Sequence, residues 1–317
     1  MEKIEGGNGR ATGVVVYQGW KGRATLPGMP AGGHDAALAL ERDGFAILPD
    51  FLDAAEVAAG RANLARYFPT PEEFFAAAPE KFAWLQAGQF AGLIDFPFVE
   101  DALNDHLTHP RLVALAWELV GADDVRLVQG RAWAKYGGNV DFDQPLHRDY
   151  PNHTLAYPSA KAGLRELIGF IYYSDVTPDS GPTCLLPHQH ASDVPVGTRH
   201  LPEGSRRQQE VQAVGPAGTV VLYSPLTFHR GSALGPPPAY RWITGFSYRA
   251  AGVDWTANQC WPPAGTTDEL HRFMARATVE QRNVLGFPPP GHPYWDDDTR
   301  AGIAARYPGI DLSPYRQ

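Results

Sequence analysis

The sequence predicts a mainly β fold with a helical support, in which amino-terminal helices pack on an antiparallel β-barrel core. The first 120 residues show helical periodicity and capping signals. From residue 121 to about 250 the chain changes to short runs rich in Val, Ile, Phe, Tyr and Thr, separated by Gly, Pro and Asp. Because no helical pattern separates these runs, a sandwich or barrel is favoured over a parallel α/β sheet.

The length and composition favour one domain that covers residues 1–317. With 44% hydrophobic residues, a chain of this length can build one large core. Four parts follow one another: an irregular arm rich in Gly and Pro (1–33), a helical support (34–120), the β-barrel core (121–250) and an extension rich in Pro and Trp (251–317).

The helical support begins with the stretch DAALALERDG, which ends at Gly44, where a left-handed cap suits glycine. A strand, FAILPDF, follows. Asp53 and Glu56 have the spacing of a capping box, which predicts a second helix to about Phe68. A third helix is expected in HPRLVALAWELVG, where the large apolar residues mostly share one side and Gly121 ends the helix.

The barrel core is expected from five runs of strand length, several of which partly alternate between apolar and polar residues. They are VRLVQGRAWAK, RELIGFIYYSD, TCLLP, GTVVLYS and RWITGFSYR. Beyond residue 250, one helix is expected in TTDELHRFMARATVEQRNVLG, and the extension is too broken by proline for a domain of its own, so we expect it to pack on the barrel. The aromatic stretch FAWLQAGQFAGLIDFPF is interpreted mainly as core, with a lid as the alternative.

Charge and composition exclude several classes of function. The net charge of −8 is spread along the chain without a basic block, which argues against a nucleic-acid partner. No apolar run approaches the roughly 20 residues that cross a bilayer. The polar residues 1–10 do not resemble a secretory signal, and Cys184 and Cys260 form no CxxC pair, so we predict a cytoplasmic protein without disulfides. The sequence carries no signal for an oligomeric state.

The candidate chemistry lies in QPLHRDYPNH. His147 and Asp149 are two residues apart at an expected strand end or loop, and residues at that spacing in a strand point to the same side. His229, placed in the loop after GTVVLYSPLTF, is a candidate third ligand. Two histidines and one carboxylate with open positions are typical of non-haem iron(II) oxygenases. The same ligand types also suit zinc, so they leave the metal open.

An arginine strengthens the oxygenase interpretation. Arg241 lies twelve residues after His229, within the run RWITGFSYR. A guanidinium there could bind the far carboxylate of a bidentate keto-acid through two parallel hydrogen bonds, which a lysine matches less well. The alternative for Arg241 is an ordinary exposed arginine on a strand.

Together these segments resemble the phytanoyl-CoA dioxygenase family of iron(II)- and 2-oxoglutarate-dependent oxygenases, over roughly residues 36–250. ALERDGFAILPDFLDAAEV resembles the family's amino-terminal helix, strand and helix, and LHRDY resembles its HxD segment. DSGPTCLLPHQH is similar to its Asn/Ser-Gly turn that ends in Pro-Gly-Ser-His, and GTVVLYSPLTFHRGS with the later arginine is similar to its distal histidine and co-substrate arginine.

The resemblance implies a double-stranded β-helix of the jelly-roll or cupin-like kind. It implies His147, Asp149 and His229 as ligands of iron(II), with 2-oxoglutarate as co-substrate and O₂ as oxidant. It also implies that four residues contact 2-oxoglutarate: Arg241 on its C5 carboxylate, helped by Ser232, and more loosely Gln129 and Lys135. The alternative for Lys135 is a lysine that faces solvent.

Two departures from the family pattern are visible. Pro187 to His190 reads PHQH instead of Pro-Gly-Ser-His, which creates a second HxH pair that we interpret as part of the turn and not as a metal site. The segment RGSALGPPPAYR carries three prolines that stiffen it, which affects the expected role of Ser232 more than that of Arg241.

The resemblance implies a dioxygenase that oxidises an unactivated C–H bond and releases succinate and carbon dioxide. Asp149 favours hydroxylation, or desaturation or ring closure, over halogenation, because halogenating relatives carry a small residue there. The expected substrate is a small metabolite or a natural-product intermediate. The alternatives are a cupin-like zinc or manganese hydrolase or isomerase, and a non-catalytic barrel that binds a ligand.

Overall fold

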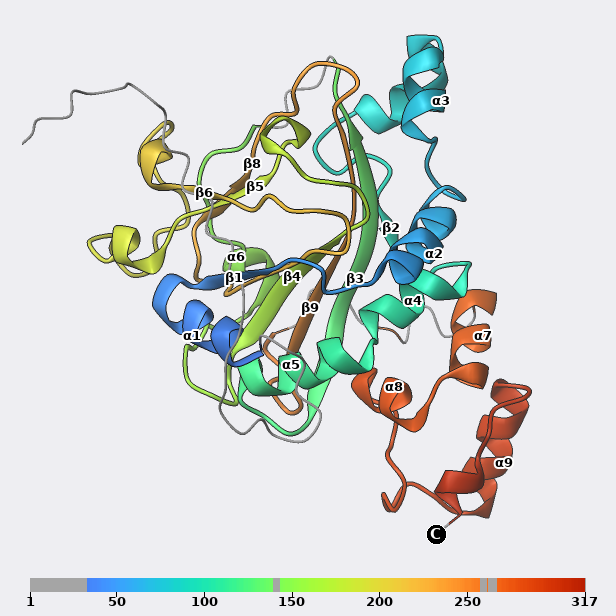
Figure 1. Cartoon of the computed structure of the whole chain (residues 1–317). Helices are drawn as coiled ribbons and strands as arrows, with labels where there is room; N and C mark the ends of the chain where they lie inside the picture. The colour runs from blue at the N-terminus through green and yellow to red at the C-terminus, as the bar shows by residue number, and fades with distance from the viewer. Residues whose placement is uncertain (1–32, 139–142, 257–260, 262–266, 317) are drawn as a thin grey trace, which may run out of the picture.

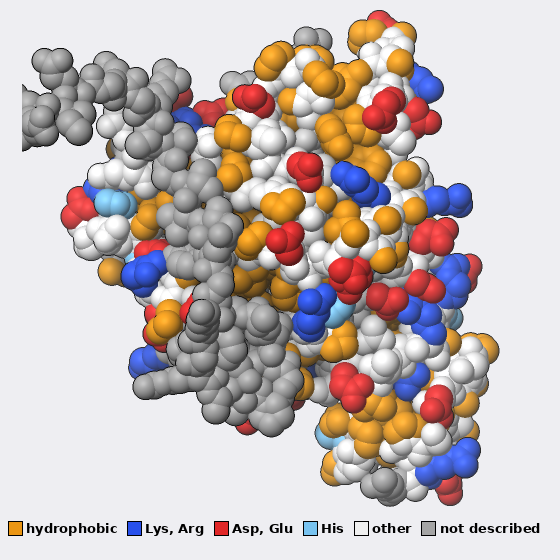
Figure 2. Space-filling view, viewed as in Figure 1, with side chains coloured by type: hydrophobic (Ala, Val, Ile, Leu, Met, Phe, Trp, Pro, Cys, Tyr) orange, Lys and Arg blue, Asp and Glu red, His pale blue; other side chains and the backbone are white. Residues whose placement is uncertain are grey.

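The computed structural model describes residues 33–138, 143–256, 261 and 267–316, and the structural statements below refer to these. The arm predicted for residues 1–33 lies outside the described residues up to position 32, as does Cys260. Figure 1 shows strands in the middle of the view, with helices below them and along the right-hand edge and α1 at the left. On the face in Figure 2, acidic and basic side chains are interspersed over the helical side.

The larger sheet has six antiparallel strands in the order β1-β7-β4-β9-β3-β2. Its bounds are β1 Phe45–Leu48, β2 Ile94–Asp95, β3 Val125–Tyr136, β4 Glu166–Tyr172, β7 Val220–Tyr223 and β9 Tyr240–Ala250. The four long strand predictions are confirmed by β3, β4, β7 and β9. The long pairing of β3 with β9 fixes which residues of these strands share the inner face.

The smaller sheet has the order β6-β5-β8, with bounds β6 Val211–Gln212, β5 Thr183–Leu185 and β8 His229–Gly231. Single bridges from His147 to His229 and to His200 extend it by two further chain segments. Side chains of both sheets, among them Trp133, Ile168 and Leu185, form one apolar cluster between them. The predicted mainly β fold with a double-stranded β-helix core and helical support is confirmed.

The amino-terminal helices cover the outer face of the larger sheet, where α5 packs on β3, β4 and β9 (Figure 1). Their bounds are α1 Gly33–Asp43, α2 Ala54–Leu64, α3 Pro71–Ala76, η1 Pro79–Gln86, α4 Asp101–Leu107 and α5 Pro110–Val120. Gly44 has the left-handed conformation predicted for it after α1, and Gly121 ends α5 as predicted, likewise with a positive φ. The capping box at Asp53 is confirmed, although α2 ends at Leu64 and not near Phe68.

Beyond the barrel the chain forms three helices, α7 Asp268–Arg276, α8 Val279–Val284 and α9 Asp297–Arg306. The single helix predicted in this region is wrong, because Ala277 leaves the helical conformation and Thr278 caps a new helix. α8 packs on β3, and Phe273 of α7 lies edge-on to Phe96. None of the described helices is long and apolar enough to cross a bilayer.

Candidate metal centre and cavity

The backbone places His147 and His229 side by side. Their peptide groups exchange two hydrogen bonds of 2.9 Å, each N–H donating to the carbonyl of the other residue. Residues paired in this way project their side chains to the same face. His229 is the first residue of β8 and not a loop residue as expected, and Asp149 follows His147 by two positions.

The three side chains converge. Nε2 of His147 lies 3.5 Å from Oδ1 of Asp149, and Nε2 of His229 lies 3.2 Å from Oδ2 of the same carboxylate. One ligand atom from each of the three residues lies within 4.8 Å of the others, which is close enough to hold one ion. Among the described residues, no other group of histidine, cysteine and acidic side chains meets this condition.

Backbone carbonyls orient both imidazoles. Nδ1 of His147 lies 2.9 Å from the carbonyl oxygen of Pro145, and Nδ1 of His229 lies 3.2 Å from that of Thr227. A carbonyl oxygen can only accept, so each Nδ1 carries a proton and each Nε2 faces Asp149, where it would coordinate a bound metal. Metal-binding histidines are commonly fixed by such an outer hydrogen bond.

Asp149 is held ionised. Burial alone would raise the pKa of its carboxyl, but His229 and His147 outweigh that effect and hold the pKa well below its usual range. The hydroxyl of Tyr223 donates to Oδ2 over 3.4 Å. An ionised carboxylate and two neutral imidazoles are the protonation states that a divalent metal requires.

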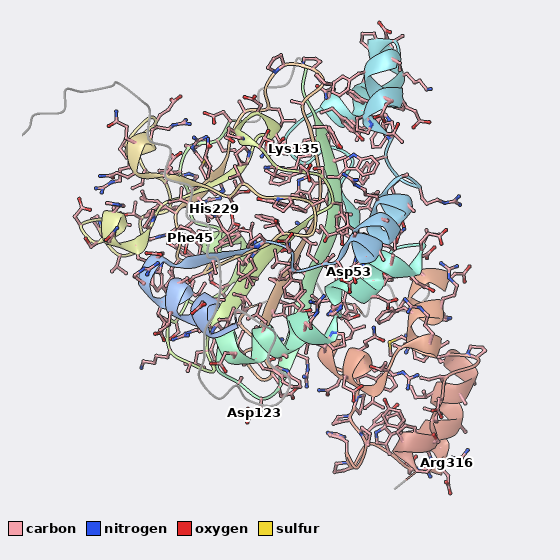
Figure 3. All side chains as sticks on the ribbon, in the orientation of Figure 1. Phe45, Asp53, Asp123, Lys135, His229 and Arg316 are labelled. Atoms are coloured by element: carbon pink, nitrogen blue, oxygen red, sulfur yellow. The ribbon has the colours of Figure 1, made fainter. Side chains whose placement is uncertain are left out.

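A cavity of about 490 Å³ opens between the two sheets and includes all three residues in its wall. The triad faces it from the smaller sheet and the segment before α6 (Tyr150–His153), while β3, β4 and β9 form the opposite wall. Figure 3 labels Lys135 on β3 and His229 on β8, one from each wall. Phe90 of the predicted aromatic stretch lies at this cavity with 60% of its surface exposed, whereas Phe96 and Phe98 are core.

Two cations lie in the cavity wall opposite the triad. Lys135 and Arg241 are direct partners in the β3–β9 register and both are buried, so the solvent-facing alternative for Lys135 is wrong. Burial lowers the pKa of both, and the neighbouring guanidinium lowers that of Lys135 further. Nη1 of Arg241 donates to the Gly181 carbonyl, while its Nε has no hydrogen-bond partner among the described residues.

This wall fits a carboxylate of a keto-acid. The guanidinium of Arg241 is buried and lines the cavity, and a buried charged donor favours an acceptor, because leaving it without one costs at least about 1–3 kcal/mol. Two neighbouring buried cations likewise favour an anion between or beside them. The residues therefore fit iron(II) on the triad and 2-oxoglutarate between the triad and Arg241.

The other two predicted co-substrate residues are placed differently. Gln129 lines the cavity, but it lies six residues from Lys135 on β3, which is roughly 20 Å along an extended strand. Ser232 is not among the residues that line the cavity, and its hydroxyl donates to the Pro182 carbonyl over 2.6 Å. The contact of Ser232 with the co-substrate stays a prediction that this geometry does not favour.

The PHQH segment forms part of a turn, as predicted. Residues 188–191 make the short helix η3, and Nε2 of His188 lies 3.3 Å from the hydroxyl of Thr227. Neither His188 nor His190 belongs to the group of described residues that could hold a metal.

Sequence reasoning missed Arg131, Trp133, His153 and Tyr223 in the cavity wall. The alternation of β3 is the signal that could have found two of them. Trp133 and Arg131 stand two and four positions from Lys135 and therefore share its face. Tyr223 and His153 depend on how distant segments pack, which no local pattern reveals.

A comparison with models of known protein families shows to which family the chain belongs. The model of the phytanoyl-CoA dioxygenase (PhyH) family matches residues 40–234, more than half of the chain. The chain belongs to the phytanoyl-CoA dioxygenase family. It is therefore a non-haem iron(II)- and 2-oxoglutarate-dependent oxygenase, and its His-Asp-His group matches that cofactor requirement.

Solved structures share the fold of this family member. The α-ketoglutarate-dependent epimerase SnoN from nogalamycin biosynthesis is 24% identical with a TM-score of 0.50, covering 70% of this chain and 84% of SnoN. HygX from Streptomyces hygroscopicus, solved with nickel and 2-oxoglutarate, is 17% identical with a TM-score of 0.50, covering 71% of this chain and 89% of HygX. A comparison with curated protein sequences finds no match.

Proposed function

We propose that His147, Asp149 and His229 hold iron(II), and that Arg241, with Lys135 beside it, binds the far carboxylate of 2-oxoglutarate. The enzyme then oxidises an unactivated C–H bond of a small metabolite or natural-product intermediate, with hydroxylation as the proposed outcome. The observation that carries this proposal is that the buried guanidinium of Arg241 lines the cavity in the wall opposite the triad, beside Lys135.

The residues have distinct tasks in this reaction. When bound, iron and 2-oxoglutarate supply the oxidising chemistry, with succinate and carbon dioxide as co-products. The carbonyls of Pro145 and Thr227 hold the two imidazoles in the tautomer that binds metal. Arg241 orients the co-substrate from the far wall. Burial of Lys135 and Arg241 keeps water away from that carboxylate.

The substrate lies in the part of the cavity that the co-substrate leaves open. Trp133, Ile168 and Phe170 give this part an apolar wall. SnoN, which shares the fold, acts in the biosynthesis of nogalamycin. Both facts support a compact organic molecule as the substrate. The carboxylate of Asp149 occupies the position that halogenating relatives leave open for chloride, which supports oxygenation.

Release of succinate tests the proposal. The purified iron(II) enzyme is incubated with 2-oxoglutarate, ascorbate and oxygen, and candidate natural-product intermediates are screened for stimulated release of succinate. We expect Asp149→Ala to abolish the stimulation, while the matched surface variant Asp193→Ala, which removes only an exposed ion pair with Arg206, leaves it intact. Stimulated succinate release by Asp149→Ala equal to that of the unchanged protein would refute the proposal.

A further inference from the structure

The charge of the cavity wall is opposite to that of the protein. The chain as a whole carries a net charge of −8. The cavity at the triad is nevertheless lined by four basic side chains, Arg131, Lys135, Arg199 and Arg241, and by one acidic side chain, Asp149, which belongs to the proposed metal site. A cleft lined by one sign of charge raises the local concentration of ligands of the other sign.

Arg131 lies away from the cations proposed for the co-substrate. Arg131, Trp133 and Lys135 alternate along β3 and all face the cavity. Four residues of extended strand separate Arg131 from Lys135, which is roughly 13 Å. The bulky Trp133 lies between them, so Arg131 and Lys135 line different regions of the cavity.

His153 supplies a second polar group in the cavity wall. It lies at the end of α6, four residues after Asp149, is 8% exposed and lines the cavity. Its Nδ1 lies 3.3 Å from Oε1 of Glu166, which is also buried. A carboxylate can only accept, so the Nδ1 proton of His153 points to Glu166.

The carboxylate of Glu166 favours the charged imidazolium. Burial and the nearby Arg131 act against protonation, but the hydrogen bond and charge of Glu166 outweigh them and raise the pKa of His153. Oε2 of Glu166 has no hydrogen-bond partner among the described residues, so nothing else described there neutralises this carboxylate directly. A protonated imidazole carries a donor on both nitrogens.

Arg131 is only partly neutralised. Its guanidinium Nε lies 3.1 Å from Oδ1 of Asp95, its direct cross-strand partner on β2. The side chain of Asp95 is 55% exposed, so water screens this pair. Arg131 and His153 both line this cavity, and the guanidinium together with an imidazole N–H donor there would attract an anion.

We propose that the substrate carries a carboxylate or a phosphate, which Arg131 and His153 bind, with Glu166 as the positioning residue of His153. The inference rests on the proposed oxygenase function and names the chemical class of its substrate. The rest of the substrate is apolar, because Trp133 packs edge-on to Phe170 beside this subsite with ring centroids 5.7 Å apart. Gly245 leaves room for the indole, since a Cβ there would approach it to 2.8 Å.

Small aromatic probes test the inference. The iron(II) enzyme is saturated with 2-oxoglutarate without oxygen, and binding of benzoate, phenyl phosphate and the neutral benzamide is measured by calorimetry. We expect at least one anion to bind roughly tenfold or more tightly than benzamide, as a charged hydrogen bond allows. The anion that binds more tightly shows whether a carboxylate or a phosphate is the preferred group.

Three variants assign the preference to residues. Arg131→Gln, His153→Gln and Glu166→Gln should each reduce the ratio of anion to benzamide affinity by roughly five- to tenfold, while benzamide affinity changes little. Arg131→Lys should recover part of the ratio. The control Arg66→Gln removes an equal charge from an exposed ion pair with Glu100 and should keep the ratio. If the variants of the buried residues His153 and Glu166 fail to fold, the Arg131 variants still test the inference, because the side chain of Arg131 is partly exposed.

Equal binding of anions and benzamide by the unchanged protein would overturn the inference. So would an anion preference that persists in both Arg131→Gln and His153→Gln. The visible band of the iron and 2-oxoglutarate complex is recorded in each sample. Absence of the band in the unchanged protein refutes the proposed function, whereas its presence without anion preference refutes only the substrate class.

Discussion

His147 and His229 exchange both backbone hydrogen bonds at 2.9 Å, although they lie on segments far apart in the chain. This pairing places the two imidazoles on one face. The carbonyls of Pro145 and Thr227 then fix the ring tautomers. The proposed metal site is therefore built from backbone geometry, and its side chains can be changed without removing the strand pairing.

His229→Ala should lower iron affinity by at least about 100-fold, because loss of a hydrogen bond behind a ligand already costs roughly 10- to 100-fold. Iron bound per chain after dialysis measures the change. His190→Ala, which alters a histidine outside the metal-binding group, serves as the control. Full iron occupancy in His229→Ala would exclude this residue as a ligand.

Arg241→Gln should weaken 2-oxoglutarate binding by about two orders of magnitude and leave iron binding unchanged. Truncation of one partner in a buried charged pair typically costs about 2–5 kcal/mol. Calorimetric titration with 2-oxoglutarate measures the effect, and Arg66→Gln controls for the loss of one charge at an exposed pair. Equal co-substrate affinity in Arg241→Gln would show that the anchor lies elsewhere.

Two glycine-to-alanine changes in helices should have opposite effects on stability. In α2, a Cβ on Gly60 would approach the Tyr173 ring to 2.1 Å, so Gly60→Ala should lower the free energy of unfolding by about 1–3 kcal/mol. In α9, a Cβ on Gly302 meets nothing within 4 Å, so Gly302→Ala should raise it by about 0.5–1 kcal/mol. Denaturant unfolding compares them, and stabilisation by Gly60→Ala would contradict the observed packing of α2.

Acid should destabilise the protein through His106. Burial lowers the pKa of its imidazole from 6.5 to about 4, and Nδ1 lies 3.0 Å from the Tyr173 hydroxyl. The unfolded chain binds a proton below pH 6.5 that the folded protein refuses until about pH 4. Stability from this group is present above pH 6.5 and is lost as the pH falls to about 4, by an amount on the order of 3 kcal/mol.

Unfolding free energies at pH 7 and pH 4.5 measure this loss. His106→Gln should show a smaller fall between the two values than the unchanged protein, because glutamine does not titrate. An equal fall in both proteins would assign the acid sensitivity to other groups.

Much of the fold is predictable from local signals. Gly44, Gly121 and the capping box at Asp53 act within a few residues, so the sequence shows them directly. The short strands β2, β6 and β8 have two or three residues, too few for an alternating pattern, and the sequence therefore conceals them. The break at Ala277 also escaped prediction, because alanine ordinarily continues a helix.

Some residues of the candidate site are likewise predictable from the sequence, and others are not. The HxD spacing and Arg241 are visible along the chain, and the resemblance to a family connects them with His229. The packing of Tyr223 against Asp149 and the pairing of His153 with Glu166 arise from tertiary contacts, which have no sequence signature. The hydrogen bond from the Ser232 hydroxyl to the Pro182 carbonyl likewise has no signature in the sequence.

One titration tests the central claim most directly. Iron(II) is added to the purified protein without oxygen, followed by 2-oxoglutarate, and the weak visible charge-transfer band of the chelated keto-acid is recorded. We expect the band to rise to saturation at one equivalent per iron, to vanish in Asp149→Ala, and to require far more 2-oxoglutarate in Arg241→Gln. A protein that binds iron at the triad but forms no band with 2-oxoglutarate would contradict the account.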